Sequence, residues 1–348
     1  MFATVPDLLR LLVIPALGWA AWRDVETRRV PSVTWYPLVA LGVVLLAWDA
    51  LGHLSFATLA DRLFFVRVGV SLLFVAPLSY AFWYLGGFGG ADAKALITFS
   101  ILLPTFPTYY LPGIALPAEA TTLGVFSMTV LTNTVIFALG YPLAMAVRNV
   151  LDGDTEVPLL FFGRRIPTVD LSTAHGRLFE TPDGYTRNGL DIDALRMYLR
   201  WRGTTLAALR GDPEGHRDPA GISRTHDPTD GAVGAGVAAD GGTVAAADTD
   251  SDTDADADSD TDADADAATT ILDAEDEWGA EAFLDSIEGS AYGTTPEKLR
   301  EGLDVVTTAD EVWISPGIPF LVPMFFGTVV AFAYGDVLFG AVGALGLV

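Results

Sequence analysis

The sequence predicts an all-α, polytopic membrane protein with about six transmembrane helices and a cytoplasmic insertion that contains a disordered acidic tract. Three observations support this fold class. The mean hydropathy is +0.39 although the chain has 44 acidic residues against 20 basic ones. The apolar residues are gathered into stretches close to the roughly 20 residues that span a bilayer. The basic residues are concentrated in alternate loops between these stretches.

Six apolar stretches are expected to cross the lipid bilayer. They run over approximately 5–22, 33–51, 63–85, 94–112, 121–147 and 317–347. The first is short and carries Asp7 and Arg10, and Arg-rich residues follow it where a signal peptide would have a small-residue cleavage site. We therefore expect it to be a retained helix.

Loop charges predict the orientation, because cytoplasmic loops are enriched in Lys and Arg. The relevant residues are Arg23, Arg28 and Arg29 after the first stretch, Lys94 after the third, and Arg148, Arg164 and Arg165 after the fifth. The sequence thus predicts a multi-pass protein of the cell membrane with both termini outside.

Between the fifth and sixth stretches lies a long hydrophilic region. We expect a membrane core over 1–147, a cytoplasmic insertion over 148–312 and a final helix within 313–348. About 213–270 is low in complexity, with alternating Asp, Ala and Thr, and cannot bury enough apolar surface to fold. Within the insertion, an amphipathic helix is expected over 190–210.

Shorter signals mark the end of this insertion. Thr295 followed by Pro296 is typical of a helix start, after a short acidic helix expected over 271–287. Trp313 is expected in the interfacial aromatic belt at the entrance of the last crossing.

Composition excludes several classes of function. The chain has no cysteine, which excludes disulfides, Cys–zinc sites and cysteine nucleophiles. Its four histidines do not occur at metal-ligand spacing, so neither a metal nor a cofactor is expected. The acidic balance argues against nucleic-acid binding. Because Lys94 and Lys298 are the only lysines and acids accumulate, we infer a salt-adapted, halophilic source.

Two aspartates stand out because each lies at the edge of an apolar stretch. Asp24 follows the first stretch and Asp92 precedes the fourth, and the predicted topology puts both on the cytoplasmic side. A carboxylate at the edge of a membrane-spanning stretch costs free energy, so both residues are candidates for a functional role. Two carboxylates that share one proton can supply a general base and a general acid for peptide hydrolysis. Ordinary helix-end charges are the alternative for either residue alone.

Glycines surround the second aspartate. Gly86, Gly87, Gly89 and Gly90 fall within five residues, and glycine permits close backbone approach and left-handed angles. The cluster predicts room for an extended substrate near Asp92. A flexible loop or tight helix packing is the alternative.

These motifs resemble those of the archaeal prepilin and preflagellin peptidases, which belong to the type IV prepilin peptidase family of GxGD membrane aspartic proteases. The resemblance rests on Asp24 with Arg28, Val30 and Pro31, on the run Gly89-Gly90-Ala91-Asp92-Ala93-Lys94, and on Ser315–Phe320. It covers about 1–150 and the last helix. Ala91 departs from the motif, in which the family has glycine.

The resemblance implies an aspartic endopeptidase with Asp24 and Asp92 as the catalytic pair. It implies that prepilin and prearchaellin precursors lose a short basic leader at the cytoplasmic membrane face. Gly89, Gly90, Ala91 and Lys94, with Arg28 and Pro31, would form the substrate approach. A presenilin-like or signal-peptide-peptidase-like intramembrane protease, and a transporter or assembly scaffold, remain as alternatives.

Other polar residues carry weaker expectations. Glu26 is the main rival carboxylate to Asp24, and Lys94 beside Asp92 favours Asp92 as the base. Asp49 and Asp61 are expected to be charges in outer loops. Asn133 lies within the fifth stretch, where hydrogen bonding between helices is the default role.

Overall fold

The computed structural model describes residues 2–85, 87–157, 159–233, 275–287, 291–317 and 319–346. It divides into a helical unit, residues 1–141 and 318–348, and an inserted unit, residues 142–317. Each has its own hydrophobic core. Most of the predicted acidic tract, from residue 234 onward, lies outside the described residues.

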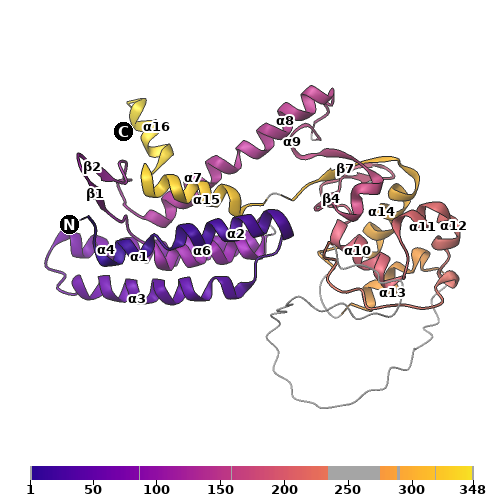
Figure 1. Ribbon diagram of the computed structural model, residues 1–348, viewed down its shortest axis with the longest axis horizontal. Helices are drawn as coiled ribbons and strands as arrows, with labels where there is room; N and C mark the ends of the chain where they lie inside the picture. The colour runs from indigo at the N-terminus through magenta and orange to yellow at the C-terminus, as the bar shows by residue number, and fades with distance from the viewer. Residues whose placement is uncertain are drawn as a thin grey trace, which may run out of the picture. The chain divides into compact units, whose positions relative to one another are not determined.

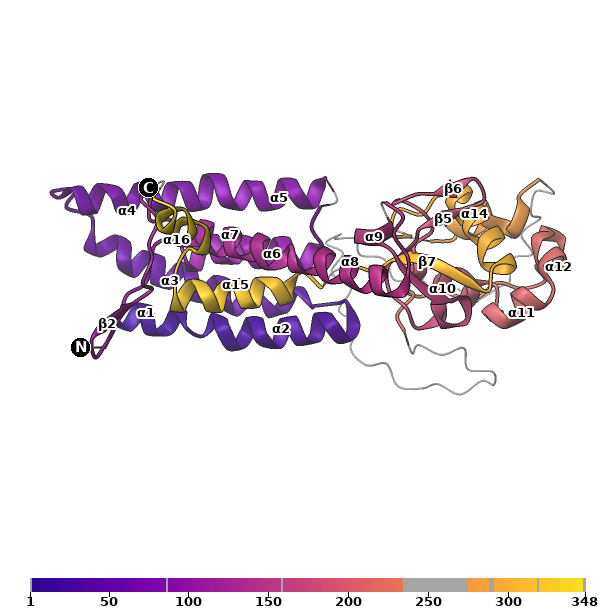
Figure 2. The same cartoon turned by 90° about the horizontal axis from the view of Figure 1, so that it is seen from above.

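The helical unit consists of helices and one small hairpin (Figures 1 and 2). Its helices are α1 (Val5–Arg10), α2 (Val13–Thr27), α3 (Tyr36–Gly52), α4 (Leu59–Val70), α5 (Ala76–Tyr84), α6 (Gly90–Leu102), α7 (Phe126–Ala138), α15 (Leu321–Ala333) and α16 (Val337–Ala344). Helix α15 packs against α2 and α7, and α6 packs against α3 and α5. The late segment α15 therefore completes a core built from the first half of the chain.

Within the described residues, four helical stretches are long and apolar enough to cross a membrane. They are Val5–Thr27, Ser32–Gly52, Leu59–Tyr84 and Phe126–Asp152. The third is continuous through a π-helical turn, Ser71–Val75, in which Ser71 Oγ donates to Ser100 O at 2.7 Å. The chain is thus a mainly helical, multi-pass membrane protein.

The two remaining predicted crossings are interrupted. Helix α6 ends at Leu102, and the expected span 94–112 continues as a hairpin of β1 (Tyr109–Leu111) and β2 (Ile114–Leu116). Prolines at 104, 107 and 112 explain the difference, because proline lacks the N–H that a helix needs.

The last predicted crossing, 317–347, breaks between α15 and α16. Gly335 adopts a left-handed φ of +108°. Asp336 caps α16 by accepting from Phe339 N at 2.9 Å and also accepts from Thr129 Oγ1 at 3.0 Å. The expectation for Asn133 is confirmed, since its Nδ2 donates to Gly335 O at 2.8 Å and so joins α7 to this break.

Two acids expected in outer loops lie elsewhere. Asp49 is within α3 and contacts the guanidinium of Arg10, which is 3% exposed. Asp61 is the third residue of α4, where it completes a capping box with Thr58. Neither acid is therefore a loop charge. Asp49 already lies inside the predicted stretch 33–51, and α4 begins four residues before the predicted stretch 63–85 and so takes in Asp61.

The inserted unit corrects the all-α prediction. A three-stranded antiparallel sheet has the order β3 (Arg164–Pro167), β7 (Glu311–Ser315), β4 (Arg177–Leu178), and β5 (Glu180–Thr181) pairs with β6 (Gly184–Tyr185). Its helices are α8 (Gly140–Asp152), α9 (Leu159–Phe162), α10 (Ile192–Trp201), α11 (Leu206–Gly211), α12 (Pro213–Arg217), α13 (Ala280–Asp285) and α14 (Pro296–Thr308).

Trp313 lies in the central strand of this sheet and not in an interfacial belt. It is 3% exposed, packs with Leu159 and Phe179, and stacks under Arg165. The expected helix over 190–210 becomes α10 and α11, and α10 buries its apolar face in the core of the inserted unit. Helix α14 starts as predicted, with Thr295 as its cap.

Candidate active site

Asp24 lies in the last turn of α2, at the boundary where the apolar stretch ends. Its side chain is largely buried, with 9% of the residue exposed. The backbone N–H of Leu321, the first residue of α15, lies next to its carboxylate. Two segments that are remote in sequence therefore meet at this acid.

Asp92 is the third residue of α6 and is equally buried, at 9% exposed. Its Oδ2 accepts a hydrogen bond from Gly89 N at 3.0 Å, so the carboxylate caps its own helix. We expected Asp92 just before the helix; the helix instead starts two residues earlier, at Gly90.

The two carboxylates lie toward the same end of the helical unit. They are close enough for the charge of Asp24 to act on Asp92. At the opposite end, Arg10 Nε donates to Leu102 O at 3.1 Å, which joins the beginning of the first stretch to the end of α6. The α2 and α6 helices are thus antiparallel.

Aromatic packing connects the loop before Asp92 to the segment that contacts Asp24. The rings of Phe88 and Phe320 have centroids 4.9 Å apart, and Phe88 also packs on Phe82 at 5.0 Å. Neither Phe88 nor the Leu321 N–H was singled out from the sequence. An aromatic residue within a glycine cluster was the available signal for Phe88, whereas a backbone donor leaves no signal in side-chain identity.

The glycine next to the capping carboxylate has a steric role. A Cβ on Gly89 would lie 2.9 Å from Asp92 Oδ2. Gly89 itself is extended, with φ of −67°, and neither Gly87 nor Gly90 has a positive φ. The expected left-handed angles are therefore absent from these three glycines, and Gly86 lies outside the described residues.

The remaining motif residues lie on α6 and in the segment just after α2. Ala91 is half-buried and packs against the core of the helical unit. Lys94 is exposed, and its Nζ contacts Ser32 Oγ. Pro31 precedes the 3-10 turn Ser32–Thr34. Arg28 follows α2 in a left-handed conformation and interacts electrostatically with Asp24.

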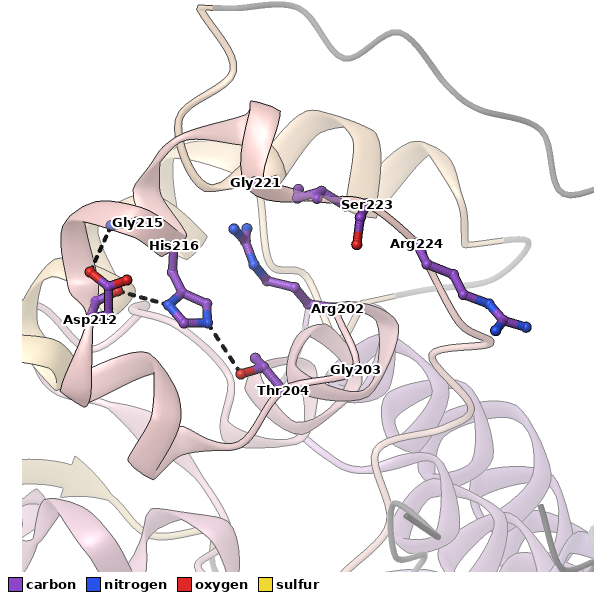
Figure 3. A pocket seen from close by; sticks show the side chains of 10 residues that line it. Arg202, Gly203, Thr204, Asp212, Gly215, His216, Gly221, Ser223 and Arg224 are labelled. Carbon is purple, nitrogen blue, oxygen red and sulfur yellow. Dashed lines mark hydrogen bonds between the residues drawn. The ribbon is translucent and has the colours of Figure 1, made fainter. Parts of the chain in front are cut away.

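A polar recess of about 260 Å³ lies within the inserted unit, and none of the residues singled out above lines it (Figure 3). Arg202, Thr204 and His216 contribute to its wall. Asp212 is the one carboxylate among its lining residues, and Asp212 Oδ1 accepts from Gly215 N at 3.1 Å. The recess therefore does not present a carboxylate pair.

A pair of buried carboxylates that lie close together can act as an acid and a base. Two neighbouring acids do not both ionise readily, so they hold one proton between them. The pair then titrates as a unit, with one member able to accept a proton and the other able to donate one. That combination suits hydrolysis by an activated water molecule.

Comparison with known proteins identifies two matching segments. Residues 11–143 match the type IV leader peptidase family, and residues 268–337 match the archaeal peptidase A24 C-terminus type II. The first match contains both Asp24 and Asp92. The second contains α13, α14, β7 and α15.

Two similar curated proteins carry the name preflagellin peptidase. The protein of Methanococcus maripaludis is 26% identical over 161 residues, which cover 44% of this chain and 67% of that protein. The protein of Methanocaldococcus jannaschii is 24% identical over 161 residues, which cover 44% of this chain and 66% of that protein. The similarity thus spans about two thirds of each relative.

Proposed function

Because the chain belongs to the type IV leader peptidase family, we propose that it is a membrane aspartic endopeptidase that removes the short basic leader from archaellin and type IV pilin-like precursors. Asp24 and Asp92 are its catalytic pair. The observation that supports this assignment is that two buried carboxylates lie toward the same end of the helical unit, near enough for the charge of one to act on the other. The names of the two similar proteins support the substrate class.

The proposed reaction is hydrolysis of one peptide bond with no cofactor. One carboxylate accepts a proton from water as the water oxygen attacks the scissile carbonyl carbon. The other carboxyl group donates its proton to the carbonyl oxygen. This proton neutralises the negative charge that would otherwise develop on that oxygen during the attack. Collapse of the intermediate breaks the C–N bond, and the first acid protonates the departing amine.

The proposed orientation puts the active site on the cytoplasmic side of the cell membrane. Arg23, Arg28 and Arg29 near Asp24 and Lys94 near Asp92 support this orientation through the positive-inside rule. Six crossings, with α6 and the α15–α16 segment as the two shorter ones, and the division into 1–147, 148–312 and 313–348 belong to the same proposal. The hydrophobic helix that follows the leader in the precursor would then lie within the bilayer.

A presenilin-like protease is the second candidate. Enzymes of that kind cut inside the bilayer, where their aspartates lie in mid-helix. Here Asp24 is in the last turn of α2 and Asp92 in the first turn of α6, which favours cleavage at the membrane edge. A transporter or scaffold would use the acids without breaking a bond.

The test is cleavage of a purified precursor that has a short basic leader before a hydrophobic helix. Wild type, Asp24→Asn and Asp92→Asn are compared in detergent at high salt, with products identified by mass spectrometry. Loss of the leader with wild type and with neither variant supports the proposal. Glu26→Gln is the matched control, because Glu26 is exposed two residues from Asp24. Full cleavage by either Asn variant would refute the pair.

A further inference from the structure

We propose that the polar recess of the inserted unit is a binding site for a phosphate group, which the guanidinium of Arg202 holds. Three segments contribute to the wall of the recess: the end of α10 with the turn after it, α12, and the residues that follow the 3-10 turn Pro219–Gly221 (Figure 3). Neither of the two proposed catalytic acids lines it. The site would therefore give the chain a binding function in addition to the proposed cleavage.

The guanidinium of Arg202 is held in place from one side. Its Nη1 donates to Tyr198 Oη at 3.0 Å and to the backbone oxygen of Trp278 at 3.0 Å. Tyr198 and Trp278 are both fully buried in the core of the inserted unit. Because both acceptors belong to this packed core, Arg202 loses little conformational freedom when it binds a ligand.

The opposite edge of this guanidinium, formed by Nε and Nη2, is available for a ligand. Within the described part of the chain, neither nitrogen donates to a carboxylate or to another acceptor. A Cβ on Gly221 would lie 3.8 Å from Nη2, so this edge faces the glycine-containing part of the recess wall. Two parallel N–H donors match two oxygens of one oxyanion. Arg202 is thus oriented for bidentate binding.

The charges that line the recess favour an anion. Arg202 and Arg224 outnumber Asp212, the one carboxylate among the described lining residues, although the whole chain has a formal net charge of −24. The Asp212 carboxylate caps α12, where its Oδ1 accepts from Gly215 N at 3.1 Å. The local positive charge raises the concentration of anions at the recess.

Hydrogen bonds between the walls form the recess without a ligand. His216 Nδ1 donates to Asp212 O at 2.7 Å, because a carbonyl oxygen can only accept. The other ring nitrogen, Nε2, lies 3.3 Å from Thr204 Oγ1. His216 therefore connects α12 to the turn after α10, as expected of a largely preformed site.

The lining also indicates which class of anion fits. Ile222 is the one apolar side chain among the described lining residues, so a polar ligand is expected. Figure 3 shows Arg202 between His216 and Ser223, whose hydroxyl has no hydrogen-bond partner in the described part of the chain. A phosphate group has a third oxygen for this hydroxyl, whereas a carboxylate has only two oxygens. The volume of about 260 Å³ leaves room for a small polar group attached to the phosphate.

The test is binding of inorganic phosphate to the purified full-length protein in detergent. Isothermal titration calorimetry at constant KCl concentration and constant pH should show saturable binding to wild type. Arg202→Lys keeps the positive charge but lacks the two parallel donors, so it should weaken binding by about tenfold or more. Ser223→Ala removes one hydrogen bond to a charged group and should weaken binding by about three- to tenfold.

Matched variants separate the recess from other effects. Arg164→Lys makes the same substitution at an exposed position on β3 outside the recess and should bind phosphate as wild type does. Asp92→Asn should also bind normally, so failure of the peptidase proposal would leave this result unchanged. Thermal melts show whether each variant folds. If Arg202→Lys does not, the exposed Ser223→Ala decides the outcome.

The phosphate could come from a lipid headgroup or from a soluble compound, and lipid composition distinguishes these sources. The titration is repeated in nanodiscs of phosphatidylcholine with and without phosphatidic acid. Weaker binding of inorganic phosphate in the presence of phosphatidic acid would identify the headgroup as the ligand, and equal binding would identify a soluble phosphate compound. Absence of saturable binding to wild type, or wild-type affinity in folded Arg202→Lys, would overturn the site.

Discussion

The ring of Phe88, in the loop before Asp92, packs on the ring of Phe320, one residue before the Leu321 N–H that contacts Asp24. This contact connects the supports of the two proposed catalytic acids. Their relative placement therefore depends on residues that carry no charge.

Phe320→Ala should lower kcat by about 10- to 100-fold, because small displacements of catalytic groups have large effects on rate. The KM for the precursor should change less. Steady-state cleavage assays measure both. Phe326→Ala is the control, since Phe326 is half-exposed and contacts Phe137 on α7. Equal losses in the two variants would contradict a positioning role for Phe320.

Arg10→Met should destabilise the protein by about 3–5 kcal/mol, because it leaves the partners of a buried ion pair without a counter-charge. Arg10 Nη1 lies 2.8 Å from Asp7 Oδ1, and Nη2 contacts Asp49. The measurement is unfolding in detergent followed by tryptophan fluorescence. Arg62→Met, at an exposed position on α4, should have little effect. Adding Asp7→Asn and Asp49→Asn to Arg10→Met should restore part of the lost stability.

Gly327→Ala and Gly69→Ala should have opposite effects on stability. A Cβ on Gly327 would lie 2.7 Å from Thr134 N, whereas a Cβ on Gly69 meets no atom within 4 Å. Overpacking at the α7–α15 contact should cost about 1–3 kcal/mol. Alanine in place of a helical glycine should stabilise α4 by up to about 1 kcal/mol. Thermal melts of the two variants, run side by side, test the sign of each effect.

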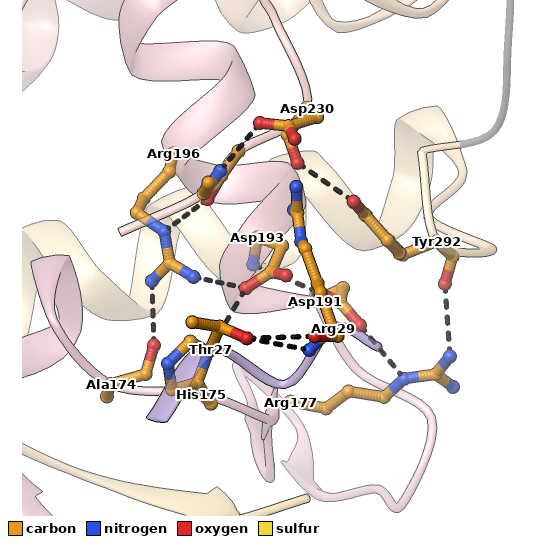
Figure 4. A network of polar contacts seen from close by, with 12 residues as sticks. Thr27, Arg29, Ala174, His175, Arg177, Asp191, Asp193, Arg196, Asp230 and Tyr292 are labelled. Carbon is orange, nitrogen blue, oxygen red and sulfur yellow. Dashed lines mark hydrogen bonds and ion pairs between the residues drawn. The ribbon is translucent and has the colours of Figure 1, made fainter. Parts of the chain in front are cut away.

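Stability should depend on the ionisation of Asp191 in the inserted unit. Burial, followed by the nearby Asp193, raises the pKa of Asp191 to about 6, although Arg177 lies within 3.4 Å (Figure 4). The folded state therefore holds this proton more tightly than the unfolded state. The stabilisation from this bound proton is fully present below about pH 4. As the pH rises toward 6 it is lost, and the free energy of unfolding falls by on the order of 2 kcal/mol.

Asp191 caps α10, where its Oδ1 accepts from Asp193 N at 2.9 Å. Asp191→Asn should flatten that pH dependence while retaining this cap, since asparagine is also a good capping residue. Melting temperatures between pH 4 and 7 measure the slope. Asp183→Asn, at an exposed position, should leave the slope unchanged. Identical slopes for wild type and Asp191→Asn would show that the proton binds elsewhere.

Sequence reasoning identified the features that depend on local pattern. The helix start at Thr295, the interhelical role of Asn133 and the positions of Asp24 and Asp92 at helix ends follow from residues close to each other in the chain. The catalytic roles of the two acids remain a prediction, as do the six crossings.

The features that sequence reasoning missed depend on remote partners. Trp313 looks like an interfacial residue until β7 pairs with β3, nearly 150 residues earlier. Asp49 looks like a loop charge until Arg10 reaches it. The backbone N–H that lies next to Asp24 is supplied by α15. Such relations have no local signature, because the side chain on one partner does not specify the other.

Helix α15, which supplies the N–H next to Asp24 and packs between α2 and α7, is encoded after the whole inserted unit. During synthesis the ribosome must produce residues 142–317 before the segment that finishes the helical unit can emerge. A nascent chain halted within that region would hold both acids but lack a wall of their site. We therefore expect no proteolytic activity in a chain that stops before α15.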